Sequence, residues 1–309
     1  MKKKFSIVMP IYKNEQNLPT TIPYVIEHRD LFSQYDVELV MVCDGSPDRS
    51  YEIMKEYKEK HPDIIKIACF TRNFGQGAAT RCGMEMAEGD VIGVISADLQ
   101  DPLELFAEML KYWEEGYPFV FGTRAHRPEK GFGGFASKTM HGLVNKYVDP
   151  RYPKGGFDFY LLDRKVAEEF IAMDAPNGST QMALLWLGYE YKAIPYDRRE
   201  RTAGKSSWKF WRKIDAASGL FITYSKLPIR LSFTLAILLA IVSMLILIWS
   251  IVFAIVVTVE GLAMHILFAI LFLALAAIAG MLGIMGEYIW RMFDMQKGRP
   301  RYVVKEMVK

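Results

Sequence analysis

The chain has 309 residues, of which 51% are hydrophobic, and it carries a formal net charge of +3 at pH 7. That length is enough for one large domain with additional segments. The small net charge, without a long basic tract interleaved with aromatic residues, excludes nucleic acid as an expected partner. The three cysteines, Cys43, Cys69 and Cys82, form no CxxC pair. They predict a reducing compartment and neither a disulfide framework nor structural zinc. The N-terminal apolar run, interrupted at Pro10, is too short for a signal peptide.

The first part of the chain, to about residue 225, has the pattern of a soluble α/β protein. Short apolar segments predict strands at 5–9, 37–42, 64–69 and 91–95, and the segments between them predict helices at 17–28, 48–61 and 77–87. Strands that alternate with helices in this way are typical of βαβ units in a parallel sheet. Ligands of such sheets bind beyond the carboxyl ends of the strands, so the loops after the strands are the expected functional segments.

Polar and small residues follow each of the four predicted strands. The four loops read PIYKNE from Pro10, CDGS from Cys43, TRNFGQG from Thr71 and SADLQDP from Ser96. One such loop alone is commonly a simple turn. Four in succession predict a ligand site along one edge of the sheet.

The loop after the fourth predicted strand has the chemistry of a metal site. Asp98, Gln100 and Asp101 offer hard oxygen ligands, which Mg²⁺ and Mn²⁺ favour, and such a cation takes further oxygens from substrate phosphates. Asp101, just before Pro102, could instead cap a helix. The loop with Gly75 could place backbone N–H groups near a phosphate. It matches neither GxxxxGK[ST] nor GxGxxG, which argues against a kinase or a dehydrogenase.

Beyond about residue 225 the sequence becomes strongly apolar. Segment 231–259 has no charged residue, and segment 262–289 has one acid, Glu287, near its end. A membrane span takes about 20 apolar residues, so the two segments and their short link predict a helical hairpin; the alternative is a pair of buried core helices. The link has no basic residue, whereas both flanks do. The positive-inside rule therefore predicts a multi-pass membrane protein with a cytoplasmic N-terminal domain. The flanking basic residues are Lys226, Arg230, Arg291, Lys297, Arg299 and Arg301.

Two segments, 131–148 and 207–227, mix aromatic, aliphatic and basic residues. This pattern predicts interfacial helices, although ordinary amphipathic helices packed on the core would have the same composition. The basic run with Arg198, Arg199, Arg201 and Lys205 could meet a lipid phosphate, or it could be a solvated charged stretch. We expect a catalytic domain at 1–205, an interfacial region at 206–230, a membrane hairpin at 231–290 and a cytosolic tail at 291–309.

The order of the motifs is that of a known family. PIYKNEQNL, VCDGSPDRS, TRNFGQGAA, SADLQDP, GGFDFYLLDR and RTAGKSSW follow one another, and the two apolar segments come after them. In this the sequence resembles glycosyltransferase family 2. Within that family it is similar to the polyprenyl-phosphate glycosyltransferases, which include dolichol-phosphate mannose synthases and bactoprenol glucosyltransferases. The resemblance implies an α/β domain of the GT-A fold with two C-terminal transmembrane helices.

The resemblance also implies roles for individual residues. Asp158 matches the acid at the reacting centre, and Asp98 and Gln100, with Asp101 nearby, match the ligands of a metal ion and a diphosphate. Arg201 and Lys205 match a basic loop that handles phosphate near the membrane. The other implied substrate-binding positions, of which the first four hold the base and ribose, are Pro10, Tyr12, Glu15, Asp44, Arg72, Gly75 and Ser96.

Four positions depart from the family pattern. Ser96 replaces the first acid of the DxD motif, and Gln76 stands where lysine is common. Tyr160 stands where arginine is common, and Ser207 stands where related sequences have lysine. We expect these departures to bear on the ribose contact, on the choice of donor or on the binding of the acceptor phosphate.

The implied reaction is inverting transfer of a sugar from a UDP- or GDP-sugar to a polyprenyl phosphate, undecaprenyl phosphate in a bacterial inner membrane, with Mg²⁺ or Mn²⁺. The sugar and the downstream envelope glycan stay open. The short strand-like run at 302–304 matches a tail that pairs with a neighbouring protomer, so a homo-oligomer is expected, with a tetramer as the first candidate. One rival is a polysaccharide synthase, which usually has more spans and a QxxRW motif, whereas this chain reads QMALLWLGYE. The other is a catalytically silent membrane scaffold, to which the missing acid points.

Overall fold

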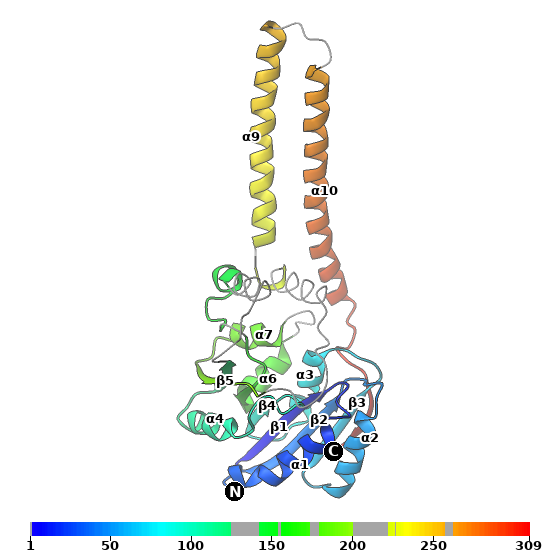
Figure 1. Ribbon diagram of the computed structural model, residues 1–309, viewed down its shortest axis with the longest axis vertical. Coiled ribbons are helices and arrows are strands. Elements are labelled where there is room, and N and C mark those ends of the chain that lie inside the picture. The colour runs from blue at the N-terminus through cyan, green and yellow to red at the C-terminus, as the bar shows by residue number, and fades with distance from the viewer. Residues whose placement is uncertain are drawn as a thin grey trace. The chain divides into compact units, whose positions relative to one another are not determined.

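The computed structural model of the protein describes residues 2–124, 142–153, 156–173, 179–199, 222–225, 227–256 and 262–309 (Figure 1). The chain forms two compact units. One comprises Met1–Lys209 together with Pro300–Lys309, and the other comprises Phe210–Arg299. Of the predicted interfacial segments, 131–141 and 207–221 lie outside the described residues. The domain boundaries proposed from the sequence stay predictions.

The first unit is built on one mixed sheet. Its strands among the described residues are β1 (Lys4–Ile11), β2 (Asp36–Cys43), β3 (Ile65–Phe70), β4 (Val91–Val94), β5 (Phe119–Arg124), β6 (Tyr160–Asp163), β7 (Tyr191–Tyr196) and β8 (Val304–Val308). They lie in the order β7-β5-β6-β4-β1-β2-β3-β8. Strands β1 to β4 are parallel, as are β5 and β7, whereas β6 and β8 run antiparallel to their neighbours. The predicted α/β fold with a mostly parallel sheet is confirmed.

The strand order reverses at β1. The chain passes from β1 outward to β2 and β3, and β4 then pairs with the other side of β1. In open α/β sheets, ligands bind beyond the carboxyl ends of the strands at such a switch point. The loops that follow β1 and β4 therefore flank the expected site.

Helices cover both faces of the sheet. They are α1 (Leu18–Glu27), the 3₁₀ helix η1 (His28–Phe32), α2 (Ser50–Lys60), α3 (Gln76–Met86), α4 (Leu105–Glu114), α6 (Arg164–Ala172) and α7 (Thr180–Trp186). Alternate residues of a strand point to opposite faces, and Phe5, Ile7 and Met9 join a core with residues of α1, α2 and α4. Val8 faces α3, where a Cβ added to Gly83 would lie 2.3 Å from Val8 Cγ1. Because both faces are covered, the strands read as continuous apolar runs.

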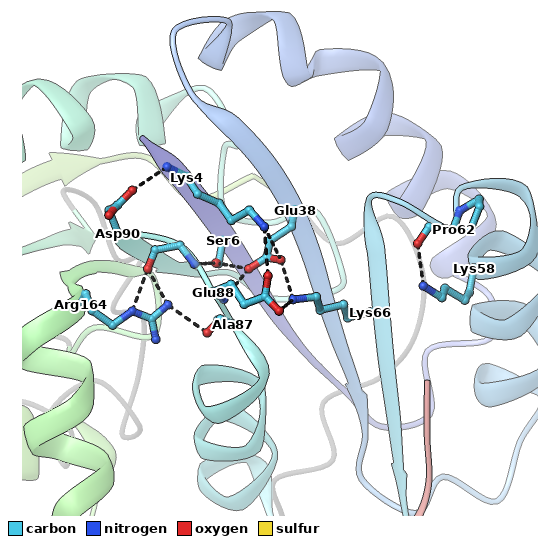
Figure 2. A network of polar contacts seen from close by, with 11 residues as sticks. Lys4, Ser6, Glu38, Lys58, Pro62, Lys66, Ala87, Glu88, Asp90 and Arg164 are labelled. Atoms are coloured by element: carbon cyan, nitrogen blue, oxygen red, sulfur yellow. Dashed lines mark hydrogen bonds and ion pairs between the residues drawn. The ribbon is translucent and has the colours of Figure 1, made fainter. Parts of the chain in front are cut away.

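A polar network lies near the amino ends of the central strands (Figure 2). Glu38 of β2, 3% exposed, accepts hydrogen bonds from Ser6 Oγ at 2.5 Å and from the backbone N–H of Glu88 at 2.6 Å. Lys66 Nζ of β3 lies 2.9 Å from its second oxygen. Burial alone would raise the pKa of the Glu38 carboxyl, but these three donors outweigh it and hold the pKa below its usual value. The network ties together the edge of the sheet opposite the predicted site.

The second unit contains α9 (Leu227–Val256) and α10 (Leu262–Gln296). Both are long and apolar enough to cross a membrane, and they match the two predicted spans. Their described side chains are not buried, which does not fit the alternative of core helices. Glu287 pairs with Arg291 one turn later, at 3.0 Å.

The C-terminal tail returns to the sheet of the first unit. Strand β8 pairs antiparallel with β3, with Ile67 opposite Val308. The strand therefore lies slightly later than the predicted run at 302–304, and its partner belongs to the same chain. Tyr302 lies before it and stacks on Phe70, with ring centroids 4.7 Å apart. Because the tail strand pairs within its own chain, it gives no support for pairing between protomers. The expected homo-oligomer stays a prediction.

Candidate active site

The loop after β4 brings two carboxylates together through the hydroxyl of Ser96. Ser96 Oγ lies 2.8 Å from Asp98 Oδ1 and 2.6 Å from Asp101 Oδ2. Leu99 has a φ of 53°, in the left-handed region, so the loop turns sharply between the two acids. The position expected to carry the first acid of DxD therefore carries a neutral hydroxyl that links two neighbouring acids.

Asp101 is buried, with 1% of its surface exposed. Its Oδ1 accepts a hydrogen bond from Tyr196 Oη at 2.6 Å and lies 3.2 Å from Arg198 Nε. Burial, followed by the charge of Asp101, raises the pKa of Tyr196, which stays a hydrogen-bond donor. Asp101 thus links the end of β7 to the loop after β4. Its contacts are those of a structural carboxylate, and its expected role as a metal ligand gains no support from them.

The loop after β7 also contacts Gln100. Gln100 Nε2 donates to the carbonyl of Arg199 at 3.3 Å, and the backbone N–H of Arg199 donates to the carbonyl of Gln100 at 2.9 Å. The guanidinium of Arg199 pairs with Glu104 at 3.1 Å. Two cations of the predicted phosphate-binding run, Arg198 and Arg199, are therefore paired with acids. Arg201 and Lys205, the other two, lie outside the described residues, as does Ser207.

The loops after β1 and β2 are joined by hydrogen bonds. The backbone N–H of Lys13 donates to Ser46 Oγ at 2.8 Å, and the carboxylate of Glu15 accepts from the backbone N–H of Arg49 at 3.0 Å. Pro10 is the penultimate residue of β1. It lies opposite Val42 of β2 and is half-buried. These contacts place Glu15 beside the start of α2, and Pro10 beside the end of β2.

Tyr12, in the same loop, is an exposed aromatic residue at this edge. Its relative exposure is 36%, and the ammonium of Lys13 lies 5.5 Å from its ring centroid. An exposed ring at the carboxyl edge of the sheet can stack on a base, as the sequence predicted.

Asp44 holds the loop after β3 in place. It is 3% exposed, and its two oxygens accept from the backbone N–H groups of Phe74 at 2.6 Å and Gly75 at 2.9 Å. Burial raises the pKa of Asp44, and these two hydrogen bonds offset part of the increase. The N–H of Gly75, expected to face a phosphate, has a protein acceptor here. The predicted base and ribose contact of Asp44 would use its remaining lone pairs.

The loops after β2 and β3 approach each other at Gly45. Its φ is 55°, and an added Cβ would lie 2.2 Å from the carbonyl carbon of Arg72. Only glycine accepts both the conformation and the contact. Arg72 itself is exposed, with its guanidinium carbon 4.2 Å from the ring centroid of Phe74. Gln76, where lysine is common in the family, is exposed at the start of α3.

The antiparallel pairing of β4 and β6 brings Asp158 to the same edge. Val94, at the end of β4, is the partner of Tyr160, at the start of β6. Ser96 and Asp158 each lie two residues beyond this pair, so both are at the carboxyl end of β4. The structure therefore places the predicted acid of the reacting centre and the predicted metal loop beside each other in the sheet. Tyr160 is buried and points into the fold, at 3% exposure.

Two donors hold the carboxylate of Asp158, whose side chain is 44% exposed. Arg124 Nη2, at the end of β5, lies 3.3 Å from Oδ2, and Gln181 Nε2, on α7, donates to Oδ1 at 2.7 Å. Sequence reasoning missed Arg124, Gln181 and Tyr196. Arg124 could have been found, because an arginine directly after an apolar strand-like run lies at the end of that strand. Gln181 carried no such signal, because only the fold brings it to Asp158.

The donor set at the loop after β4 fits a divalent cation that shares its ligands with a substrate. Among the described residues no group of three or more His, Cys, Asp or Glu could hold a metal ion by itself. Asp98, Gln100 and Ser96 supply one carboxylate, one amide and one hydroxyl. Mg²⁺ and Mn²⁺ accept such oxygen ligands and complete their shells with water and phosphate oxygens.

The fold and the polar edge define an α/β catalytic domain of the GT-A type. Residues 6–170, more than half of the chain, match the family described as Glycosyl transferase family 2. A crystal structure of a mycobacterial protein superposes with a TM-score of 0.51 at 15% identity and covers 71% of this chain and 74% of that one, which reflects the fold alone.

Curated relatives align over nearly the whole chain. An uncharacterized glycosyltransferase, YkcC of Bacillus subtilis (strain 168), is 34% identical over 98% of this chain and 94% of its own length. The SfII prophage-derived bactoprenol glucosyl transferase of Shigella flexneri is 31% identical over 98% of each chain. The protein belongs to glycosyltransferase family 2.

Proposed function

We propose that this protein transfers a hexosyl group, with glucose as the first candidate, from a nucleoside diphosphate sugar to a polyprenyl phosphate in a bacterial membrane. The observation that carries the proposal is the similarity to bactoprenol glucosyl transferases along 98% of the chain, including its two apolar helices. Undecaprenyl phosphate is the acceptor that we expect, and UDP and GDP are both candidate carriers of the sugar.

The donor is proposed to bind along the loops after β1, β2 and β3. Tyr12 would stack on the base, and the carboxylates of Glu15 and Asp44 would accept hydrogen bonds from the base or ribose. Arg72 is exposed at the same edge and would meet the diphosphate. The hydrogen bonds that join these loops support the proposal, because a rigid set of loops loses little entropy on binding.

Asp98, Gln100 and Ser96 are proposed to hold a Mg²⁺ or Mn²⁺ ion together with the diphosphate. Such an ion, when bound, neutralises the charge that develops on the leaving nucleoside diphosphate. The bond from Ser96 to Asp101 keeps the loop in one conformation, with Asp98 at the edge of the sheet.

The acceptor needs little activation in this reaction. A phosphate monoester has a second pKa of about 6 and is mostly dianionic at neutral pH. Its oxygen attacks the anomeric carbon, the bond to the diphosphate breaks, and the configuration inverts in a single displacement. Asp158 is the proposed catalytic acid residue. It would orient the sugar or the lipid phosphate, or accept a residual proton.

The membrane helices fit a lipid acceptor. Helices α9 and α10 are each long enough to cross a bilayer, and basic residues lie at the start of the first span and at the end of the second. We propose that the catalytic domain lies on the cytoplasmic side, where nucleotide sugars are made.

The test uses the purified full-length protein with polyprenyl phosphate and a panel of UDP- and GDP-sugars, with and without Mg²⁺ or Mn²⁺. Mass analysis should find one polyprenyl-phosphate sugar that forms only with the cation.

Asp98→Asn and Asp158→Asn should each reduce the rate by about 100-fold or more. Glu27→Ala, at an exposed position at the end of α1, is the control and should be as active as the wild type. Absence of any lipid-linked sugar with every donor, together with no binding of nucleotide sugar, would support the scaffold instead.

A further inference from the structure

Gln181, in the first turn of α7, fixes the carboxylate of Asp158. Its Nε2 donates to Asp158 Oδ1 at 2.7 Å and to the carbonyl of Phe157 at 2.7 Å. These two bonds use both hydrogens of the amide nitrogen. Gln181 therefore fixes the Asp158 side chain relative to the backbone that carries it.

A tyrosine sets the orientation of this amide. Turned over, Gln181 would present its oxygen to the oxygen of Asp158, and the two would repel each other. Tyr152 opposes this, because its hydroxyl donates to Gln181 Oε1 at 2.9 Å. Tyr152 is 9% exposed, and burial, followed by the charge of Asp158, raises its pKa to about 12. The hydroxyl therefore keeps its proton at neutral pH, and the amide keeps its direction.

The backbone between these residues leaves room for the arrangement. Gly156 has a φ of 67°, and a Cβ added there would lie 2.9 Å from Tyr152 Oη and 3.7 Å from Gln181 Oε1. A side chain at this position would be strained by the positive φ and would push against the hydroxyl of Tyr152, which donates to Gln181. Glycine therefore leaves the Tyr152 hydroxyl in the position from which it donates to Gln181.

The second oxygen of Asp158 has a different partner. Arg124 Nη2 lies 3.3 Å from Oδ2, so a guanidinium on β5 and an amide on α7 hold the carboxylate from two sides. The arginine contact is the longer one, and its side chain is 22% exposed. The shorter bond from Gln181 is the one that determines the direction of the carboxylate.

We infer that Gln181 is a positioning residue for glycosyl transfer, with Tyr152 fixing its amide. The inference rests on the proposed function, in which Asp158 acts at the reacting centre. A misplacement of about 1 Å in a catalytic group can cost about 100-fold in rate. The competing role is purely structural, in which Gln181 only fastens α7 to the segment before β6.

The experiment measures kcat and KM for the sugar donor with the full-length protein and polyprenyl phosphate, over a range of about pH 5 to 9. Gln181→Met keeps the length of the side chain and removes its hydrogen bonds. It should lower kcat by about tenfold or more and change the donor KM by less than about twofold. Tyr152→Phe frees the amide to turn and should lower kcat by about threefold. Tyr191→Phe removes another tyrosine hydroxyl, which donates to the carbonyl of Arg151 at 3.4 Å, and should behave as the wild type.

The pH profile of Gln181→Glu separates positioning from a structural role. A protonated glutamic acid can donate to Asp158 as the amide does, whereas an ionised one repels it. The activity of this variant relative to the wild type should therefore be highest at the acid end of the range and fall as the pH rises. A residue that only fastens α7 would give a profile parallel to that of the wild type.

The outcomes distinguish the two proposals. An active wild type with unchanged kcat in Gln181→Met and a parallel profile in Gln181→Glu overturns the positioning role and leaves the proposed function standing. If Gln181→Met does not fold, an unchanged kcat in Tyr152→Phe together with a parallel pH profile in Gln181→Glu overturns the positioning role equally. A wild type that transfers no sugar from any donor overturns the proposed function, and the positioning role falls with it.

Discussion

The rings of Phe70 and Tyr302 stack with their centroids 4.7 Å apart and their planes 15° from parallel. Phe70 ends β3, and Tyr302 belongs to the tail that follows α10. Phe70 also meets the ring of Phe74 edge to face at 5.8 Å. The hydroxyl of Tyr302 is hydrogen-bonded to Glu85 of α3. The tail therefore supports the loop after β3, where the proposed donor-binding Arg72 lies.

Replacing Tyr302 with alanine should loosen both the tail and this loop. We expect the free energy of unfolding to fall by about 2 kcal/mol, because the ring stacking and its buried area are lost. The KM for the sugar donor should rise several-fold, as the loop that carries Arg72 loses its support. Thermal unfolding of the full-length protein and donor titration measure the two effects.

Tyr302→Phe keeps the stacking and loses only the bond to Glu85, so its loss should be no more than about 1 kcal/mol. Met307→Ala, on the same tail with a side chain that is 40% exposed, should change little. Equal effects of Tyr302→Ala and Met307→Ala would contradict a specific role of the stacked ring.

The hydroxyl of Ser96 should matter although it replaces an acid. In Ser96→Ala the buried Oδ2 of Asp101 loses a donor at 2.6 Å, which should cost about 1–3 kcal/mol of stability. Thermal unfolding measures this loss. Ser33→Ala, an exposed serine near the amino ends of the strands, is the control and should lie within about 0.5 kcal/mol of the wild type.

Ser96→Asp tests the same site by charge. It places a third carboxylate beside Asp98 and Asp101, and like charges at this distance repel. The variant should unfold at a lower temperature without a cation and gain more from added Mn²⁺ than the wild type does. A thermal shift with Mn²⁺ no larger than that of the wild type would speak against a cation at this loop.

The positions that the sequence predicted well are those governed by local pattern. The strands near 5–9, 37–42, 64–69 and 91–95 alternate with helices, and the polar loops after them meet at one edge because parallel strands share their direction. That reasoning brought Tyr12 and Asp98 to one rim without any knowledge of side-chain contacts.

The features that sequence reasoning missed depend on pairings between distant segments. Tyr196 and Arg198 contact Asp101 because β7 lies beside β5 in the sheet, and no local pattern predicts that neighbour. The same is true of Gln181, which reaches Asp158 from α7. In the sequence, Ser96 was interpreted as the loss of the first acid of the DxD motif. In the structure its hydroxyl links two acids, Asp98 and Asp101.

Gly45→Ala should disturb the donor loops more than any nearby surface change. The new Cβ would meet the backbone of Arg72 at 2.2 Å, and φ is 55° at this position, so the loops after β2 and β3 must separate. We expect weaker donor binding by about tenfold or more and a loss of about 1–3 kcal/mol in stability. Gly116→Ala, which has φ 104° and an open surrounding, is the matched control. It carries the backbone strain without the contact, so it should lower stability without weakening donor binding, as calorimetric titration of the nucleotide sugar would show.

The ion pair of Glu38 with Lys66 predicts how stability depends on pH. Hydrogen bonds and ion pairs with Lys66 and Lys4 lower the pKa of Glu88 to about 2, and the pKa of Glu38 also lies below its usual value. A carboxyl with a lowered pKa in the folded state contributes stability above its unfolded pKa, and that contribution is lost as the pH falls through the folded value. The free energy of unfolding should therefore decrease from about pH 4.5 downward.

Lys66→Met removes the nearer of the two lysine partners of Glu38, a carboxylate that is 3% exposed, and leaves Lys4 at 3.7 Å. It should cost about 2 kcal/mol at neutral pH, because the buried charge of Glu38 keeps only the hydrogen bonds from Ser6 and Glu88 and the more distant Lys4. It should also flatten the acid limb of the stability curve. Lys55→Met breaks the exposed pair with Glu306, at 2.6 Å, and should change stability little, since solvent screens such pairs. Denaturant unfolding of the full-length protein across the acid range measures both variants. A Lys66→Met protein with wild-type stability and an unchanged acid limb would show that the lysine has no part in holding the carboxylate ionised.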